Sequence, residues 1–129
     1  LHSFPTRRSS DLNLSRKFLG ENKIIGASVF NVAQAEVAIK EGCDYLGVGT
    51  IFPTSSKNDA KSVSFDELKK IAEFSSVPVI AIGGINEKNI LKLKGFSLSG
   101  VAVISAILGA ENIENSAKNL LTSAKEIFI

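Results

Sequence analysis

Four short runs of apolar residues, separated by amphipathic stretches, limit the fold of this chain more than any other feature. The runs cover residues 24–29, 45–52, 77–82 and 100–104. They are continuously apolar instead of alternating with polar residues, which is typical of parallel strands buried on both faces. Strands that alternate with helices form consecutive βα units. Four such units predict an α/β fold, either an open doubly wound sheet or half of a (β/α)₈ barrel.

Helical signals follow the apolar runs. Asn31 and Gln34 predict the N-terminus of one helix. Ser64 and Glu67 form a capping-box pattern at the start of the next, in which each side chain accepts from the backbone N–H of the other residue. Two further stretches predict helices: 87–95, which is short, and 117–128, where apolar residues recur at helical spacing. Asp44 precedes its strand, so we expect a cap or turn residue there.

Residues 1–12 (LHSFPTRRSSDL) differ from the rest of the chain. They have neither helical nor strand periodicity, and they look like the in-frame translation of a sequencing adapter. We therefore expect a non-native segment over 1–12 and one native domain over 13–129. The alternative is a genuine basic, Ser-rich tail. Without this segment the chain has no histidine, because His2 is the only one.

Composition excludes several classes of function. With 129 residues the chain can form one compact domain, and a formal net charge of +2 is too small to indicate a nucleic-acid partner. Cys43 is the only cysteine, so no disulfide framework or multi-cysteine metal site is expected. No apolar run reaches the roughly 18 residues of a membrane span. We expect a cytoplasmic protein with no membrane partner.

Candidate site residues follow the ends of the apolar runs, where α/β proteins bind ligands. They are small, hydroxylic or cationic: Ser28, Thr54, Ser55, Ser56, Lys57, Gly83, Gly84 and Ser105. The glycine pair could form only a tight turn, and Ser105 could cap a short helix. Together, in consecutive units, they fit the phosphate site that barrels build from the loops after their last two strands. The loop 53–61 is either an ordinary surface loop or a lid.

Three stretches, in order, resemble motifs of the thiamine phosphate synthase family. They are GCDYLGVGTIFPTSSK at 42–57, AIGGI at 81–85 and GVAVISAI at 100–107. The resemblance covers about residues 14–129. It implies a partial (β/α)₈ TIM barrel made of the last four βα units, strands 5–8 of a phosphate-binding barrel. It also implies a transferase of thiamine biosynthesis, which condenses an aminopyrimidine methyl diphosphate with hydroxyethylthiazole phosphate to give thiamine phosphate and diphosphate.

The resemblance assigns roles to the candidate residues. Those implied to bind the thiazole substrate and its phosphate are Thr54, Ser55, Ser56, Gly84, Ile104 and Ser105. Lys57 and Ser28 are implied to contact the diphosphate and to be the catalytic residues, because a fixed cation on the leaving group acts most in the transition state. Mg²⁺ is the implied cofactor. Its ligands are expected in an N-terminal half that these 129 residues do not include, and no metal ligand is assigned here.

Two departures from the family pattern stand out. Phe30 occupies a position where relatives often have histidine, which suggests a difference at the edge of the pocket. Residues 94–99 (KGFSLS) replace the usual Gly-Ala-Asp-Gly approach to the last strand. That segment is expected at the far end of the barrel, where it would affect stability more than chemistry.

Two alternatives stay open from the sequence. A thiazole tautomerase-like relative would share the barrel, but it would need an acid-base group such as histidine. A truncated, non-catalytic half-barrel would leave two sheet edges unpaired and an apolar face uncovered, and it would self-associate through them. In both cases the expected ligands are small phosphorylated molecules.

Overall fold

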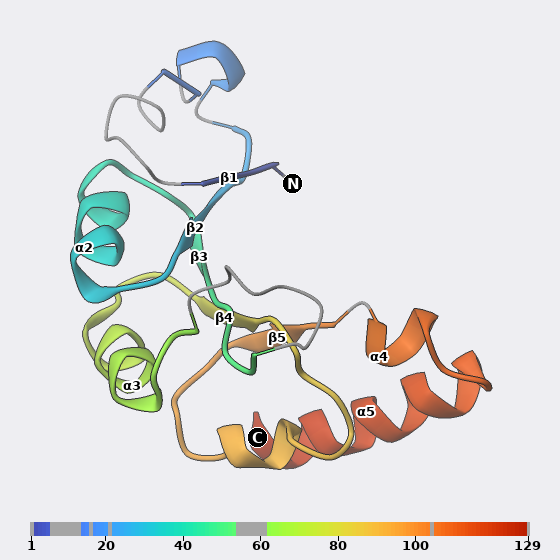
Figure 1. Ribbon diagram of the computed structural model, residues 1–129. Coiled ribbons are helices and arrows are strands. Elements are labelled where there is room, and N and C mark those ends of the chain that lie inside the picture. The colour runs from blue at the N-terminus through green and yellow to red at the C-terminus, as the bar shows by residue number, and fades with distance from the viewer. Residues whose placement is uncertain are drawn as a thin grey trace.

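The chain forms one parallel five-stranded sheet with helices packed on one side (Figure 1). The computed structural model describes residues 2–5, 14–15, 17–20, 22–53, 62–103 and 105–128. The strands are β1 (His2–Pro5), β2 (Ile25–Val29), β3 (Tyr45–Val48), β4 (Val79–Ile82) and β5 (Gly100–Ala102), paired in that order. The helices are α2 (Val32–Lys40), α3 (Phe65–Phe74), η1 (Ile90–Leu93, a 3₁₀ helix), α4 (Ser105–Leu108) and α5 (Ile113–Ile127).

Strands β2 to β5 confirm the four predicted apolar runs, although each strand is shorter than its run. The helices predicted after them are confirmed as α2, α3, η1 and α5. Strand β1 was not predicted, because residues 1–12 have no strand periodicity. It pairs parallel with β2, from His2 opposite Ile25 to Pro5 opposite Ser28. Parallel pairing uses backbone groups, so a segment without apolar periodicity can still add a strand at an edge. The non-native origin of 1–12 stays a prediction.

Alternate strand residues face the helices and form the core. Ile25, Ala27 and Val29 of β2 are buried, and so are the residues that continue the same face across the sheet. The helices contribute a second set of buried side chains, namely Ala35, Ala38, Leu68, Ile71, Ile90, Leu93 and Leu120. Figure 1 shows α2, α3 and α5 together on this side of the sheet. The core therefore lies between one sheet face and one layer of helices, as in a barrel wall.

On the opposite face, large side chains lie over glycines. A Cβ on Gly26 would fall within the ring of Tyr45 on the neighbouring strand. A Cβ on Gly47 would lie 2.8 Å from Ile82 Cδ1. No described helix covers this face, and Ile82 is 37% exposed. Such alternation of large and small residues is typical of the inner face of a small barrel.

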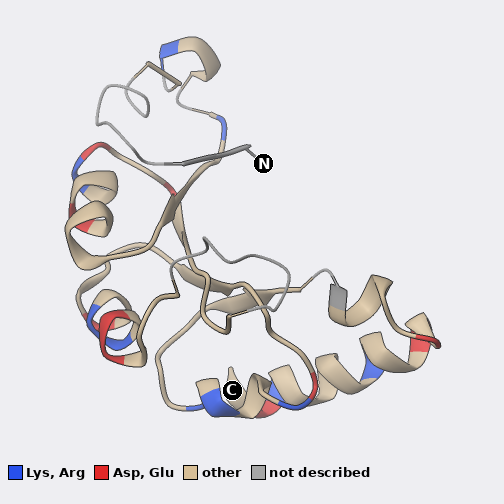
Figure 2. Ribbon diagram, viewed as in Figure 1, with Lys and Arg blue, Asp and Glu red and all other residues tan. Residues whose placement is uncertain are grey.

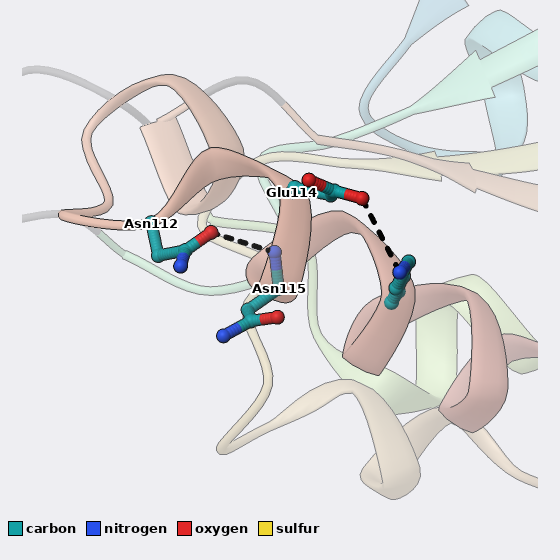
Figure 3. Close-up of polar contacts among 4 residues, drawn as sticks. Asn112, Glu114 and Asn115 are labelled. Carbon is teal, nitrogen blue, oxygen red and sulfur yellow. Dashed lines mark hydrogen bonds and ion pairs between the residues drawn. The ribbon is translucent and has the colours of Figure 1, made fainter.

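Capping residues fix the helix ends. Asn31 Oδ1 accepts from the N–H of Gln34 (2.8 Å), so the predicted N-terminus of α2 is confirmed. At the start of α5, Asn112 Oδ1 accepts from the N–H of Asn115 at 3.0 Å (Figure 3). An exposed ion pair between Glu114 and Lys118 (3.3 Å) follows on the same helix, at the spacing that places side chains on one helix face.

Asp44 joins the starts of β2 and β3. Its Oδ2 accepts from the N–H of Ile25 and its own N–H donates to the carbonyl of Ile25, both at 2.7 Å. The prediction of a cap or turn residue is confirmed. This pair lies at the amino ends of the strands, at the opposite edge of the sheet from the candidate site.

Candidate phosphate site at the carboxyl ends of the strands

The glycine pair after β4 forms a turn that only glycine accommodates. Gly83 has φ +101° and Gly84 has φ +68°, a region that other residues adopt at a steric cost. A Cβ on Gly83 would lie 2.8 Å from Thr50 Cα, and one on Gly84 would overlap the carbonyl oxygen of Phe52. Both glycines are therefore required by backbone conformation and by the close approach of the loop after β3.

Backbone hydrogen bonds join the loop after β3 to this turn. The N–H of Ile51 donates to the carbonyl of Ile82 (3.0 Å), and the N–H of Phe52 donates to the carbonyl of Gly83 (3.1 Å). The loop thus continues the pairing of β3 with β4 past the ends of both strands. The diglycine turn and the beginning of the 53–61 loop form one structural unit.

Asn86 and Asn89, which follow the diglycine turn, form hydrogen bonds to each other and to Gly84. Asn89 Nδ2 donates to the carbonyl of Gly84 (2.8 Å), and Asn89 Oδ1 accepts from the N–H of Asn86 (2.8 Å). Asn86 Oδ1 accepts in return from the N–H of Asn89 (3.1 Å). Sequence reasoning missed Asn89. The signal was an asparagine three residues after Asn86, a spacing that favours such reciprocal bonds at a turn.

The two backbone polar groups of Gly84 differ in their partners among the described residues. Its carbonyl is bonded to Asn89, whereas the described residues provide no hydrogen-bond acceptor for its N–H. Because there is no side chain at Gly84, an anion could approach this amide closely. The backbone geometry is suited to binding one phosphate oxygen.

The neighbouring strand ends at the same edge. Ile82 pairs with Ala102, so the end of β5 lies beside the diglycine turn. Helix α4 begins at Ser105, three residues after the last residue of β5. Ile104 lies outside the described residues. Of the predicted phosphate-binding residues, the structure therefore places Gly84 and the backbone of Ser105 after adjacent strands.

The described residues before and after the 53–61 loop lie close together at the sheet edge. The N–H of Val63 donates to the carbonyl of Thr50 (2.6 Å), and the rings of Phe52 and Phe65 meet edge-to-face with centroids 5.8 Å apart. The residues predicted to grip substrate here, Thr54, Ser55, Ser56 and Lys57, lie outside the described residues. The structure describes the residues on either side of them, up to Pro53 and from Ser62 onward.

Ser28 lies on the face of β2 that points away from the helices. It is exposed between buried Ala27 and Val29, and it pairs in register with Gly47. Phe30 follows at the strand end and is 41% exposed. Ser28 thus shares the open face of the sheet with Gly47.

Charged groups lie around the sheet and not on it. Figure 2 shows the described Lys, Arg, Asp and Glu residues on helices and connections, and the strands carry none. In the described part of the chain, no three His, Cys, Asp or Glu residues come together as a metal site would need. No helix in the described ranges is long and apolar enough to cross a membrane.

Comparison with known proteins identifies the family. The sequence profile of the thiamine monophosphate synthase family matches residues 6–107. A thiamine-phosphate synthase from Clostridium tetani is 49% identical over 108 residues, which are 84% of this chain and 52% of that protein. One from Methanococcus maripaludis is 46% identical over 111 residues, 85% of this chain and 54% of that protein. The chain spans about half the length of the curated relatives it matches.

Solved structures agree with the sequence comparison. Thiamine phosphate pyrophosphorylase from Pyrococcus furiosus superposes with a TM-score of 0.87 at 35% identity, over 98% of this chain and 60% of that one. A 3-hexulose-6-phosphate synthase superposes with a TM-score of 0.72 at 17% identity, a likeness of fold alone. The parallel strands thus match part of a thiamine phosphate synthase TIM barrel, and the open doubly wound alternative is wrong. The chain belongs to the thiamine monophosphate synthase family.

Proposed function

We propose that this chain provides one part of a thiamine phosphate synthase active site. The reaction would join an aminopyrimidine methyl diphosphate to hydroxyethylthiazole phosphate, giving thiamine phosphate and diphosphate. The observation that carries the proposal is the diglycine turn, which packs against Thr50 and Phe52 and in which no described residue accepts from the N–H of Gly84. The 49% identity to a thiamine-phosphate synthase supports the reaction.

The part of the barrel is the C-terminal half, with β2 to β5 as strands 5–8. Phosphate sites of such barrels are built from the loops after strands 7 and 8. Here those loops would be the diglycine turn after β4 and the start of α4 after β5. Residues 1–12 would be non-native, and sequencing the genomic DNA upstream of Asn13 tests this: an unrelated upstream sequence would support it, and an uninterrupted match to 1–12 would reject it.

The roles of individual residues follow from charge and position. The N–H of Gly84 and the Ile104–Ser105 edge would bind the thiazole phosphate, and Thr54, Ser55 and Ser56 would hold the rest of that substrate. Lys57 and Ser28 would contact the diphosphate, where negative charge increases as the bond to the pyrimidine methyl group breaks. A fixed cation there stabilises the transition state more than the ground state. The thiazole nitrogen would then attack the methyl carbon.

Water must be kept from the reacting carbon, and the open sheet face, on which Ser28 and Ile82 are exposed, would need the other half of the barrel to cover it. The side chains that flank Ser28 across this face are apolar: Tyr45 lies over Gly26, and Ile82 lies over Gly47. Mg²⁺, when bound, would neutralise charge on the departing diphosphate. Its ligands would come from the other half of the barrel.

An activity assay tests the proposal. We expect no thiamine phosphate formation by the 129-residue chain alone, and formation once the missing half is joined to it. In that full-length enzyme Lys57→Ala should lower kcat by about 10²- to 10³-fold, the usual effect of removing one group that stabilises developing charge. Lys69→Ala, on an exposed position of α3, is the control and should keep its activity. A full-length enzyme without activity would reject the function, and full activity in Lys57→Ala would remove Lys57 from the mechanism.

Self-association of the isolated chain would follow from the same fold. In the described sheet β1 and β5 are the two edges, and no described helix covers the face that bears Tyr45 and Ile82. Unpaired edges and uncovered apolar surface favour pairing with a second copy. Sedimentation over a range of concentrations would test this: a concentration-dependent dimer or larger species supports it, and a monomer throughout opposes it.

A further inference from the structure

The capping box predicted for α3 is only half formed. The side chain of Ser64 accepts from the N–H of Glu67 (3.1 Å), as the pattern requires. The carboxylate of Glu67, however, does not accept from the N–H of Ser64. Its Oε2 accepts from the N–H of Val32 at 2.9 Å, 35 residues earlier in the chain. A group that would normally stabilise its own helix is used instead to connect two helices.

This bond joins the first turns of α2 and α3. Val32 is the first residue of α2 and Glu67 is the third residue of α3. Both helices begin at the carboxyl ends of the strands, because each follows its strand in a βα unit. The bond therefore lies at the edge of the sheet that bears the candidate site.

Each helix start is close in sequence to a part of the proposed site. Helix α2 follows Ser28 after three residues, and Asn31 and Gln34 fix that turn by accepting from the N–H groups of Gln34 and Phe30. Helix α3 follows residues 62–64, where the N–H of Val63 donates to the carbonyl of Thr50. Glu67 thus connects the turn after Ser28 with residues 62–64, which precede α3.

We propose that Glu67 is a positioning residue, which holds residues 62–64 in a fixed relation to the Ser28 turn through its bond to the Val32 N–H. This rests on the proposed function, because it assigns the two connected segments to one substrate site. The bond is formed by an ionised acceptor, and hydrogen bonds of this kind are stronger than those between neutral groups. Loss of this hydrogen bond should increase the mobility of both segments.

Hydrogen exchange of the 129-residue chain tests the connection without reference to the reaction. In Glu67→Ala the N–H of Val32 and the N–H of Val63 should both exchange faster. In Glu67→Gln, whose amide oxygen can still accept, both should stay close to the unsubstituted chain. Glu73→Ala removes the same charge from an exposed position near the end of α3 and is the control. Faster exchange of Val32 alone would reduce Glu67 to a local helix cap and overturn the proposal.

Binding of hydroxyethylthiazole phosphate tests the positioning role. At a temperature well below the unfolding midpoint, Glu67→Ala in the full-length enzyme should bind this probe about tenfold more weakly, as expected for the loss of one hydrogen bond to a charged group. Glu67→Gln should recover most of the affinity, and Glu73→Ala should be unchanged. A purely structural Glu67 would lower the unfolding midpoint and leave the affinity unaltered, which would contradict the proposal.

The two measurements separate the proposals. If the full-length enzyme with Glu67 unsubstituted does not bind the probe, the proposed thiazole phosphate site is wrong, while the exchange rates of Val32 and Val63 still decide whether Glu67 connects the two segments. If the probe binds and Glu67→Ala binds it equally well, the site stands and the positioning role is wrong.

Discussion

The N–H of Phe52 donates to the carbonyl of Gly83 at 3.1 Å, and this bond joins the base of the 53–61 loop to the diglycine turn. Because the bond lies beyond the ends of both strands, movement of the loop base and the conformation of the turn are connected through the backbone. The site proposed for the thiazole phosphate therefore depends on a hydrogen bond between two backbone groups. This dependence makes the turn sensitive to added volume.

Gly84→Ala should lower the free energy of unfolding markedly. A left-handed φ costs alanine about 1–2 kcal/mol, and the new Cβ would also overlap the carbonyl oxygen of Phe52. Gly95→Ala is the matched control, since Gly95 has φ +89° and no atom within 4 Å of the added Cβ. Urea unfolding should give a loss about 2 kcal/mol greater for Gly84→Ala than for Gly95→Ala. Equal losses would mean that the close approach of Phe52 is not important.

Gly26→Ala should displace the ring of Tyr45. The added Cβ would lie inside the ring, so the side chain must rotate away at a cost of about 1–3 kcal/mol. Tyr45 is the only tyrosine and the chain has no tryptophan, so intrinsic fluorescence reports this ring alone. We expect a changed tyrosine emission in Gly26→Ala. In Gly100→Ala the new Cβ would meet only the flexible end of Ile80 at 3.3 Å, and the emission should stay the same.

The rings of Phe65 and Phe96 should contribute jointly to stability. Their centroids are 5.5 Å apart at 70°, an edge-to-face arrangement worth about 0.5–1.5 kcal/mol beyond burial. A double-mutant cycle with Phe65→Leu and Phe96→Leu should give a coupling energy in this range. Additive effects would contradict a direct interaction. The same cycle on Phe52 and Phe65 tests the second edge-to-face pair.

Asp44→Ala should destabilise the sheet by about 1–3 kcal/mol, because it leaves the fully buried Ile25 without an acceptor for its N–H. Asp44→Asn should lose less, since an amide oxygen can still accept. Glu36→Ala, an exposed position on α2, serves as the control for removal of one negative charge. Thermal unfolding measures all three. A loss in Asp44→Asn as large as in Asp44→Ala would show that the charge, not the acceptor, is what stabilises the pair.

Patterns within short segments of the sequence predicted four strands, two helix starts and the glycine turn. Continuous apolar runs predicted β2 to β5, and Asn31 and Ser64 predicted where α2 and α3 begin. The glycine pair predicted a turn, and its positive φ values confirm that only glycine is suited to it. The strand at His2–Pro5 could not be predicted because its pairing uses the backbone alone.

Contacts between units could not be predicted from spacing. The capping box predicted a local partner for Glu67, but tertiary packing places the N–H of Val32 within its reach. Phe96 is the clearest case. Its segment was expected at the far end of the barrel, and the N–H of Ser99 does donate to the carbonyl of Val79 at the start of β4. The ring of Phe96 nevertheless packs against Phe65, the first residue of α3, a contact that the sequence did not predict. Which group lies nearest to a side chain depends on how consecutive βα units pack against each other. The periodicity of a single sequence does not contain that information.

The central claim is that the N–H of Gly84 binds the phosphate of the thiazole substrate. The most direct measurement is the amide chemical shift of Gly84 during titration of the full-length enzyme with hydroxyethylthiazole phosphate. We expect a large, saturable shift at Gly84 and none at Gly95, which has a similar backbone conformation away from the site. A titration that leaves Gly84 unchanged, or that shifts Gly84 and Gly95 equally, would contradict it.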